Sequence, residues 1–500
     1  MPEDVHLLRF GDQRQEITVA ARLESAPLPV ADGLLLPAGR IALLHGMPEA
    51  QVYRHGWNSW SPSGWRAMAE APLRIASARR RLTADDTVWD DPHHHHSSAV
   101  TALAGPDGNV LLVGALGLDV PRLTIDRDTI TGWYERGGAP WFATYGPELE
   151  VFRRYARVLG EHLAPGHERN RAGNVWCSWY AYHEDIDQET LRADLASLDG
   201  LPFDVFQIDD GWERSVGDWQ PNEKFPAGMA DLAARATDAG LSPGLWLSPF
   251  IVRPESATAR EKAHLLLTDE AGRPLPAGYN WGGPYYGLDL TLPEAQEHIR
   301  DVISTVVGWG FRYLKLDFVN GVAITAERHD PSRGRETVYR EAMRLIREAA
   351  GPDVYLLGSG APVLPSLGVC DAIRVGPDVA PFWTNYATDD PSDATAENAL
   401  VSSVHRLWLR ELVDLDPDVV YFRTRQSLLT ARERELLADL AHICGFKATS
   451  DPPGWLDGPE RAGLTDFLAR DKPVVQLGRY RFDLGGREVD LTAAAERRAG

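Results

Sequence analysis

Two patterns of hydrophobic and polar positions divide the chain. From residue 1 to about residue 171, short alternating runs such as NVLLVGALGL (109–118) are separated by Gly, Pro and Asp. Alternation with a period of two, broken by turn residues at this spacing, is typical of antiparallel strands. The pattern predicts an antiparallel β-sandwich as the N-terminal domain, residues 1–171.

From residue 172 onward, short apolar runs alternate with amphipathic helical segments, which is typical of βα units around a parallel sheet. Asp187 is a candidate N-cap for the helix in DQETLRADLASL, and Gly351 ends GRETVYREAMRLIREAAG where a C-cap is needed. Eight candidate strands predict an α/β fold, a (β/α)8 TIM barrel, over residues 172–448. The candidate strands are 174–180, 205–210, 243–251, 313–319, 354–359, 371–376, 411–415 and 419–423. The last two lie too close together for a full helix, so one of them is expected to be wrong.

The end of the chain returns to alternating strands. KPVVQLGRYRFDLGGREVDL surrounds the Gly485-Gly486 pair, which is typical of a turn between two strands. Residues 449–500 are therefore predicted to form a small C-terminal β domain.

Composition narrows the classes of function. With 500 residues and a 44% hydrophobic fraction, the chain can bury one large core and smaller ones. The net charge of −21, with no long basic stretch, argues against a nucleic acid partner. Sixteen tryptophans are many for this length, and an indole face can stack on the apolar side of a pyranose ring. A small neutral or cationic ligand fits this composition better than a polyanion.

Other sequence signals bear on location and cofactors. No run approaches the roughly 20 apolar residues of a membrane span, and MPEDVHLLRF lacks the features of a signal peptide. We therefore expect a cytoplasmic protein without a membrane partner. Cys177, Cys370 and Cys444 are an odd number at spacings that indicate neither disulfides nor zinc, so reduced thiols are expected. The sequence does not decide the oligomeric state, and a homo-oligomer is one alternative.

The stretch YLKLDFVNG (313–321) places two charges on one face of a predicted strand. Lys315 and Asp317 are two residues apart, so both face the same side of the sheet. An unpaired buried charge is costly, so the two either neutralise each other or serve a site. Because barrel interiors consist mainly of branched aliphatic side chains, and barrel sites form at the carboxyl ends of the strands, the site is favoured.

Two more strand ends carry charged residues. QIDDGW places Asp209 and Asp210 together, where adjacent carboxylates suit a polyhydroxylated ligand or a cation, and a simple Asp turn is the alternative. DAIRVGPDV ends a later strand with Arg374 and presents Asp378 after a Gly-Pro turn, where Asp378 could also only cap the turn. A closed barrel could bring Asp378 opposite Asp317.

Two facing carboxylates, hydroxyl-binding acids and tryptophans together describe a glycosidase. One Asp would act as nucleophile and the other as general acid, about 5–5.5 Å apart in a retaining enzyme. This chemistry needs no metal and no organic cofactor, and we expect neither.

Two further polar stretches contain histidines that could belong to a site or to a loop. His93 to His96 are consecutive, so they cannot all face one metal ion, and a solvated loop is expected. His183 and Glu184 follow the first barrel strand, where they either line the rim of the pocket or begin a helix.

Taken together, these motifs resemble the α-galactosidases of glycoside hydrolase family 36, the melibiase group, in their compact bacterial form. The resemblance covers about residues 174–423 and extends to HGWNSWSPSGW (55–65). The motifs that carry it are QIDDGW, GLWLSPFIV, YLKLDFVNG, GSGAPVLPSLGVCDAIRVGPDVAPFW and LDPDVV, in that order.

The resemblance implies roles for individual residues. It implies release of terminal α-linked galactose, as from melibiose or raffinose-type sugars, with retention through a covalent galactosyl-Asp intermediate. Asp317 would be the nucleophile and Asp378 the acid/base. The residues implied to bind or shape the sugar pocket are Asp209, Asp210, Lys315, Arg374, Trp179, Trp246 and Asn320.

Three alternatives stay open at this point. A galactosyl transferase of the raffinose synthase kind would share the covalent intermediate and differ in the acceptor. An α-N-acetylgalactosaminidase would differ in the sugar. A barrel that binds sugar without catalysis would lack one of the two carboxylates, and both are present.

Overall fold

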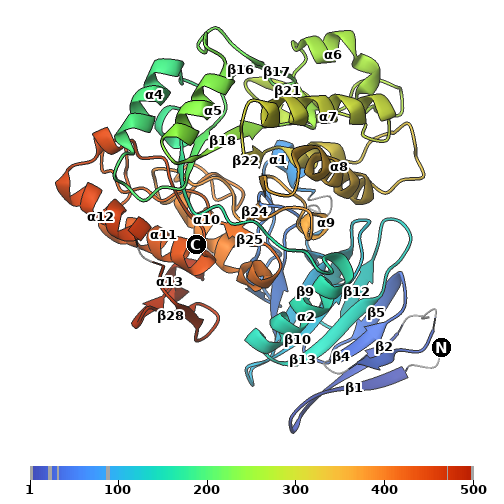
Figure 1. Ribbon diagram of the computed structural model, residues 1–500. Helices are drawn as coiled ribbons and strands as arrows, with labels where there is room; N and C mark the ends of the chain where they lie inside the picture. Colours follow the sequence, from blue (N-terminus) through green and yellow to red (C-terminus); the bar gives the residue numbers. More distant parts are fainter. Residues whose placement is uncertain (1–3, 21–24, 31–32, 86–90, 470, 497–500) are drawn as a thin grey trace.

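The computed structural model describes residues 4–20, 25–30, 33–85, 91–469 and 471–496. Figure 1 shows an N-terminal β domain beside a larger barrel, with a small sheet near the C-terminus. The predicted fold class is confirmed: antiparallel sheets precede a nearly closed barrel of eight parallel strands. Within the described ranges, no helix has the length and apolar composition that a membrane crossing requires.

The N-terminal domain consists of two antiparallel sheets. Their facing side chains form one apolar core. Several strands of the first sheet alternate buried and more exposed positions, whereas the central strands of the second sheet are buried along nearly their whole length. The first sheet contains, in spatial order, β1 (Asp4–Phe10), β2 (Gln13–Val19), β5 (Arg40–Leu44), β12 (Thr129–Trp133), β11 (Arg122–Ile125) and β8 (His95–Ser98). The second contains β3 (Leu28–Val30), β4 (Gly33–Leu36), β13 (Trp141–Pro147), β10 (Asn109–Ala115), β9 (Val100–Ala104), β6 (Gln51–Arg54) and β7 (Gly64–Ala67).

The barrel strands follow one another around the sheet in chain order. They are β14 (Asn174–Cys177), β15 (Val205–Ile208), β18 (Ser242–Leu247), β22 (Tyr313–Leu316), β23 (Tyr355–Gly358), β24 (Ala372–Arg374), β25 (Asp414–Asp416) and β26 (Lys447–Thr449). β26 pairs in parallel with β14. Between β25 and β26 the backbone N–H of Val420 donates to Ala448 at 2.9 Å, so an irregular segment bridges the remaining gap.

The predicted eighth strand at 419–423 is wrong. Those residues are buried but irregular, and the eighth strand is β26, after helix α11. A helix follows each strand: α4 (Gln188–Ser197), α5 (Met229–Asp238), α7 (Pro293–Gly308), α8 (Arg335–Ala350), α9 (Val363–Ser366), α10 (Ala396–Val404), α11 (Ala431–Cys444) and α12 (Gly458–Ala469). The two predicted caps are confirmed: Asp187 accepts from the Thr190 N–H, and Gly351 ends α8.

Shorter elements connect and extend these layers. α2 (Glu148–Leu163) packs on the second sheet, where the Tyr155 hydroxyl donates to the Ala115 carbonyl. The other helices are α1 (Ala78–Ala84), α3 (Trp179–Tyr182), α6 (Ala257–Glu261) and α13 (Thr492–Ala495). Additional strands are β16 (Glu213–Ser215), β17 (Asp218–Pro221), β19 (Ile251–Val252), β20 (Pro276–Asn280), β21 (Gly283–Gly287) and the C-terminal sheet β27 (Val474–Gln476), β28 (Arg481–Leu484) and β29 (Arg487–Asp490). Four 3-10 turns are η1 (Ala263–Leu265), η2 (Val319–Ala323), η3 (Leu407–Glu411) and η4 (Pro453–Trp455).

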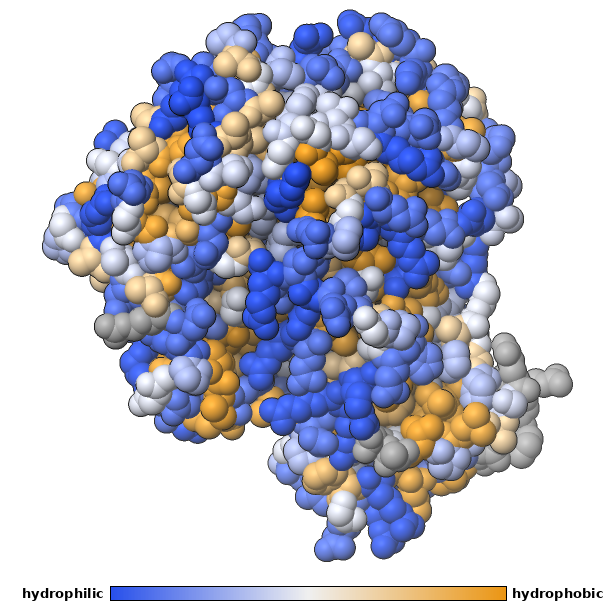
Figure 2. Space-filling model, in the orientation of Figure 1, coloured by the Kyte–Doolittle hydropathy of each residue, from blue (hydrophilic) through white to orange (hydrophobic). Residues whose placement is uncertain are grey.

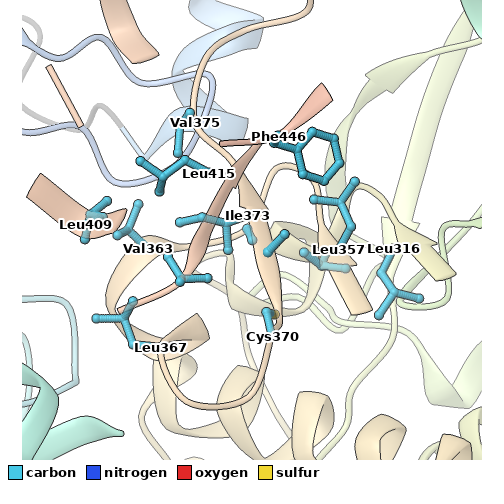
Figure 3. Close-up of a cluster of buried hydrophobic side chains, with 14 of the residues drawn as sticks. Leu316, Leu357, Val363, Leu367, Cys370, Ile373, Val375, Leu409, Leu415 and Phe446 are labelled. Carbon is cyan, nitrogen blue, oxygen red and sulfur yellow. The ribbon is translucent and has the colours of Figure 1, made fainter. Parts of the chain in front are cut away.

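Apolar side chains from neighbouring barrel strands and the adjoining segments meet in one cluster. Figure 3 shows Leu316, Leu357, Ile373 and Leu415 converging with side chains from flanking segments. All four are buried, so this layer removes a large apolar area from water and fixes the strand ends that carry the polar residues. The face shown in Figure 2 is mainly hydrophilic with discontinuous apolar areas, consistent with the high net negative charge.

A buried guanidinium attaches the N-terminal domain to the barrel. Arg406 is fully buried and donates hydrogen bonds to the carbonyls of Gly56, Asn58 and Ser61 and to Val375, which follows β24. Burial lowers the pKa of Arg406 to about 10, which still leaves it charged at neutral pH. The carbonyl oxygens therefore take the place of water around this cation.

We expect Arg406→Met to destabilise the protein by about 3 kcal/mol or more, because buried carbonyls would lose their donors. Urea unfolding followed by circular dichroism measures this. Arg432→Met, at an exposed ion pair on α11, should change stability by less than about 0.5 kcal/mol. Equal stability of the Arg406 variant and the wild type would contradict the anchoring role.

Candidate active site

The charged residues predicted from the strand ends meet at the carboxyl end of the barrel. Asp209 and Asp210 directly follow β15, Lys315 lies in β22 and Asp317 follows it, and Arg374 ends β24. Because parallel strands all end at the same rim, side chains far apart in sequence come together there. Asp378 lies four residues after Arg374. Of these six residues four are buried, and Asp317 and Asp378 are half-buried.

Lys315 is paired with Asp209 rather than with Asp317. Its Nζ lies 2.8 Å from Asp209 Oδ2, and both side chains are nearly inaccessible to solvent. Burial alone would lower the pKa of Lys315, but the Asp209 charge outweighs it and holds that pKa above its ordinary value. Gln207 Nε2 and Cys177 Sγ also donate to Asp209 Oδ2. Lys315 and Asp209 thus form a buried ion pair within the site.

Asp317 is held by one donor on each oxygen. The indole Nε1 of Trp246 donates to Oδ2 at 3.1 Å, and the backbone N–H of Phe318 donates to Oδ1 at 2.8 Å. Phe318 has a left-handed backbone, with φ of 49°, which is unusual for an aromatic residue. Strain of this kind is often retained at functional sites, and here it turns an N–H toward the carboxylate.

Asp378 shares a guanidinium with two fully buried carboxylates. Arg374 Nη1 lies 3.0 Å from Asp378 and 2.7 Å from Asp418, while its Nε lies 2.8 Å from Asp416. The Asp378 side chain is 35% exposed, so it borders the open part of the site. Burial, together with the charges of Asp418 and Asp317, raises the pKa of Asp378 to about 7 against the opposing effect of Arg374.

Asp210 lies in an acidic corner beside Asp209. Trp281 Nε1 donates to Asp210 Oδ2 at 2.9 Å, and the buried Glu213 side chain interacts with the same carboxyl group. Burial and the Glu213 charge raise the pKa of Asp210 to about 9, and burial also raises the pKa of Glu213. The two carboxyl groups therefore titrate as a pair.

Two of the predicted pocket residues have other contacts. Asn320 is buried and donates from Nδ2 to the Thr83 carbonyl at 3.2 Å, which links η2 to α1. Trp179, in α3, is half-buried and meets the His183 ring edge-on, with ring centroids 5.1 Å apart. His183 itself has a left-handed backbone, with φ of 50°.

Several residues of the site were missed from the sequence. Asp416 and Asp418 lie in LDPDVV, a motif of the family resemblance that by itself assigns no role to its acids. Tyr180, buried beside them, donates its hydroxyl to Asp418. Trp281 lies in a hairpin turn, where the sequence shows only NWGG between two short strands, and nothing in that pattern indicated a contact with Asp210.

The histidine cluster lies away from these residues. The expected solvated loop describes the exposed His93, but His95 and His96 are buried in β8, which corrects that prediction. His94 Nδ1 lies 2.7 Å from Asp91. Among the described residues, no group of three or more His, Cys, Asp or Glu side chains is arranged to hold a metal ion.

A helix of the N-terminal part contributes to the mouth of the barrel. The guanidinium of Arg79 in α1 lies 4.7 Å from the centre of the Tyr279 ring in β20, and Arg80 pairs with Asp393. The N–H groups of Ala76 and Ser77 donate to Asp390. α1 thus bridges the β20–β21 hairpin and the long loop after β24, beside the end of β22 (Figure 1).

Comparison with known proteins gives matches over different parts of the chain. A family model described as Melibiase matches residues 142–348. The α-galactosidase AgaA of Geobacillus stearothermophilus is 29% identical over 204 residues, which are 39% of this chain and 27% of AgaA. The aligned part therefore spans about a quarter of that curated relative.

A solved α-galactosidase from Thermus thermophilus, TtGalA, is similar over its whole length. Its complex with p-nitrophenyl α-D-galactopyranoside is 43% identical, with a TM-score of 0.90, and the match covers 98% of this chain and 100% of TtGalA. Its complex with stachyose matches at a TM-score of 0.85 over 93% of this chain and 100% of TtGalA. On this similarity, the chain belongs to the melibiase family, the α-galactosidases of glycoside hydrolase family 36.

Proposed function

We propose that this protein is a retaining glycoside hydrolase that releases terminal α-linked galactose through a covalent galactosyl-Asp317 intermediate. The observation that carries the proposal is the difference between two carboxyl groups at one barrel mouth. Asp317 accepts two hydrogen bonds that orient it, whereas burial raises the pKa of Asp378 to about 7. A carboxyl group with a raised pKa suits a general acid, and the neighbouring oriented carboxyl group then has the role of nucleophile.

In the first step, Asp317 attacks the anomeric carbon while Asp378 gives its proton to the glycosidic oxygen, and the aglycone leaves. In the second step, Asp378 accepts a proton from water, the water oxygen bonds to the anomeric carbon, and Asp317 is released. Arg374 is proposed to keep Asp378 at the site in both steps, since its Nη1 donates to Asp378 Oδ1 at 3.0 Å.

The remaining residues are proposed to hold the sugar. Asp209, Asp210 and Lys315 present carboxyl and ammonium groups that suit a sugar's hydroxyl groups. Trp246 acts mainly on Asp317, since it is buried and donates to that carboxylate. The half-buried Trp179 is the better stacking surface. Asn320 is also proposed to contact the sugar, in addition to the hydrogen bond that its Nδ2 donates to the Thr83 carbonyl.

The proposed substrates are α-galactosides with an exposed galactose end, such as melibiose and raffinose-type sugars. Support comes from TtGalA, whose structures contain an aryl α-galactoside and stachyose. Transfer to a sugar acceptor would use the same intermediate and stays an alternative, as does an α-N-acetylgalactosaminide substrate. The cytoplasmic location and the homo-oligomer remain sequence predictions.

Replacement of the nucleophile tests the mechanism. Asp317→Ala should lower release of nitrophenol from the aryl α-galactoside by at least about 10³-fold, because the covalent step is lost. In the wild type, proton NMR of the first product should show α-galactose before mutarotation. Near-normal activity of the variant, or β-galactose as the first product, would contradict the proposal.

A panel of aryl glycosides tests the sugar. We expect the α-galactoside to be hydrolysed at least about 100-fold faster, in kcat/KM, than the α-glucoside or the α-N-acetylgalactosaminide. The α-glucoside has its 4-hydroxyl in the other orientation, which leaves a buried acid without its partner, and the α-N-acetylgalactosaminide replaces the 2-hydroxyl by a bulkier acetamido group. Preference for either of the other two sugars would overturn the substrate assignment. Adding free raffinose and analysing products by chromatography separates hydrolysis from transfer.

The raised pKa of Asp378 predicts a stability effect. Between its ordinary pKa of 3.8 and its folded value of about 7, the folded state binds the proton that the unfolded state has lost. This contribution to stability is complete at low pH and is lost as the pH rises through 7. Asp378→Asn avoids that loss, so its melting temperature should exceed the wild-type value more at pH 8.5 than at pH 5.

Asp238→Asn, at an exposed carboxylate that ends α5, is the matched control and should show no such trend. Thermal melts of the three proteins at both pH values make the comparison. A difference between the Asp378 variant and the wild type that is the same at both pH values would contradict the raised pKa.

A further inference from the structure

A tryptophan occupies a turn that its backbone disfavours. β20 and β21 form a hairpin in which Asn280 pairs with Gly283, so Trp281 and Gly282 alone make the turn. Their φ angles are 48° and 75°, both left-handed. Two-residue turns of this kind strongly favour Asn-Gly, because a side chain is strained at positive φ. The hairpin would therefore fold more easily without a tryptophan at its first turn position.

The strained indole makes a specific contact with the site. Trp281 Nε1 donates to Asp210 Oδ2 at 2.9 Å. Among the residues that the structure describes, it is the only group that donates a hydrogen bond to the Asp210 carboxyl group. The other neighbours of that group are the acids Glu213 and Asp209, and Asp210 shares a hydrogen bond with Glu213. The indole thus fixes one Asp210 oxygen and sets the orientation of this carboxyl group at the site.

The same ring also touches the groups that hold Asp317. Its centroid lies 5.1 Å from Phe318, whose N–H donates to Asp317, and 6.4 Å from Trp246, whose indole donates to the other Asp317 oxygen. Tyr285 from β21 packs behind it, with centroids 6.0 Å apart. Trp281 therefore contacts Asp210, a proposed sugar-binding acid, and also the two residues that donate hydrogen bonds to Asp317, the proposed nucleophile.

We propose that Trp281 is a positioning residue for substrate recognition: it orients the Asp210 carboxyl group toward a hydroxyl of the galactose ring and closes one wall of the sugar pocket. This inference rests on the proposed function and extends it to a residue outside the strand-end motifs. Backbone strain at the turn is the cost of this placement, and it is consistent with a functional role.

Two substitutions distinguish the effect of the indole N–H from the effect of the strained turn. Trp281→Phe keeps an aromatic ring and removes the donor, so KM for the aryl α-galactoside should rise about tenfold or more while kcat changes less than about threefold. Trp281→Asn relieves the turn and removes the ring, so kcat/KM should fall further while the melting temperature does not decrease. Trp133→Phe, in β12 of the N-terminal domain, should leave both kinetic constants unchanged.

A double-mutant cycle tests whether Trp281 acts through Asp210. Calorimetry should measure galactose binding in the Asp317→Asn background, where hydrolysis is absent. In that background, Trp281→Phe should weaken binding about tenfold, and adding it to Asp210→Asn should weaken binding by less than about twofold, because the acceptor is already changed.

Each outcome bears on one proposal. Wild-type kinetics in Trp281→Phe, or losses that multiply fully with those of Asp210→Asn, would overturn the positioning role and leave the proposed function standing. A wild-type enzyme that does not hydrolyse the aryl α-galactoside would instead overturn the proposed function. Loss of melting temperature without a change in KM would reduce Trp281 to a structural residue.

Discussion

The cost of burying charge governs the carboxyl end of this barrel. Lys315 and Arg374 are both nearly inaccessible, and burying either charge without acidic partners would be costly. Asp209 balances the first, and Asp416, Asp418 and Asp378 surround the second. Burial, together with the surplus of acids over cations, raises the pKa values of Asp378 and Asp210. The proposed acid/base thus follows from burial and the local charge balance.

Much of the architecture could be predicted from local patterns. Apolar runs located most barrel strands, and Asp187 and Gly351 bounded two helices because capping depends on adjacent residues. β26 was missed because KAT is three residues long and contains Lys447, whose ammonium bonds to the Leu468 carbonyl. VVYFR was taken as a strand because it is apolar, but it packs as a buried irregular segment.

The sequence predicted which charged residues meet at the site better than it predicted which of them pair with each other. Strand-end charges identified Asp209, Lys315, Asp317 and Arg374, since a barrel directs such residues to one rim. The partner of Lys315 lies 106 residues earlier in the chain, and no local pattern distinguishes it from Asp317 two residues away. Trp281 could not be found from sequence, because a turn position reveals neither its φ nor the carboxylate that its indole meets.

The anchor at Arg406 has a consequence for the order of biosynthesis. The loop that it holds, around Ser61, leaves the ribosome 345 residues before Arg406 does. At usual rates of translation, this interval lasts on the order of 20–70 s. During that time the N-terminal domain can form its own core, but its loop has no guanidinium to bind. Attachment of this loop to the barrel is thus a late event, which requires synthesis of most of the chain.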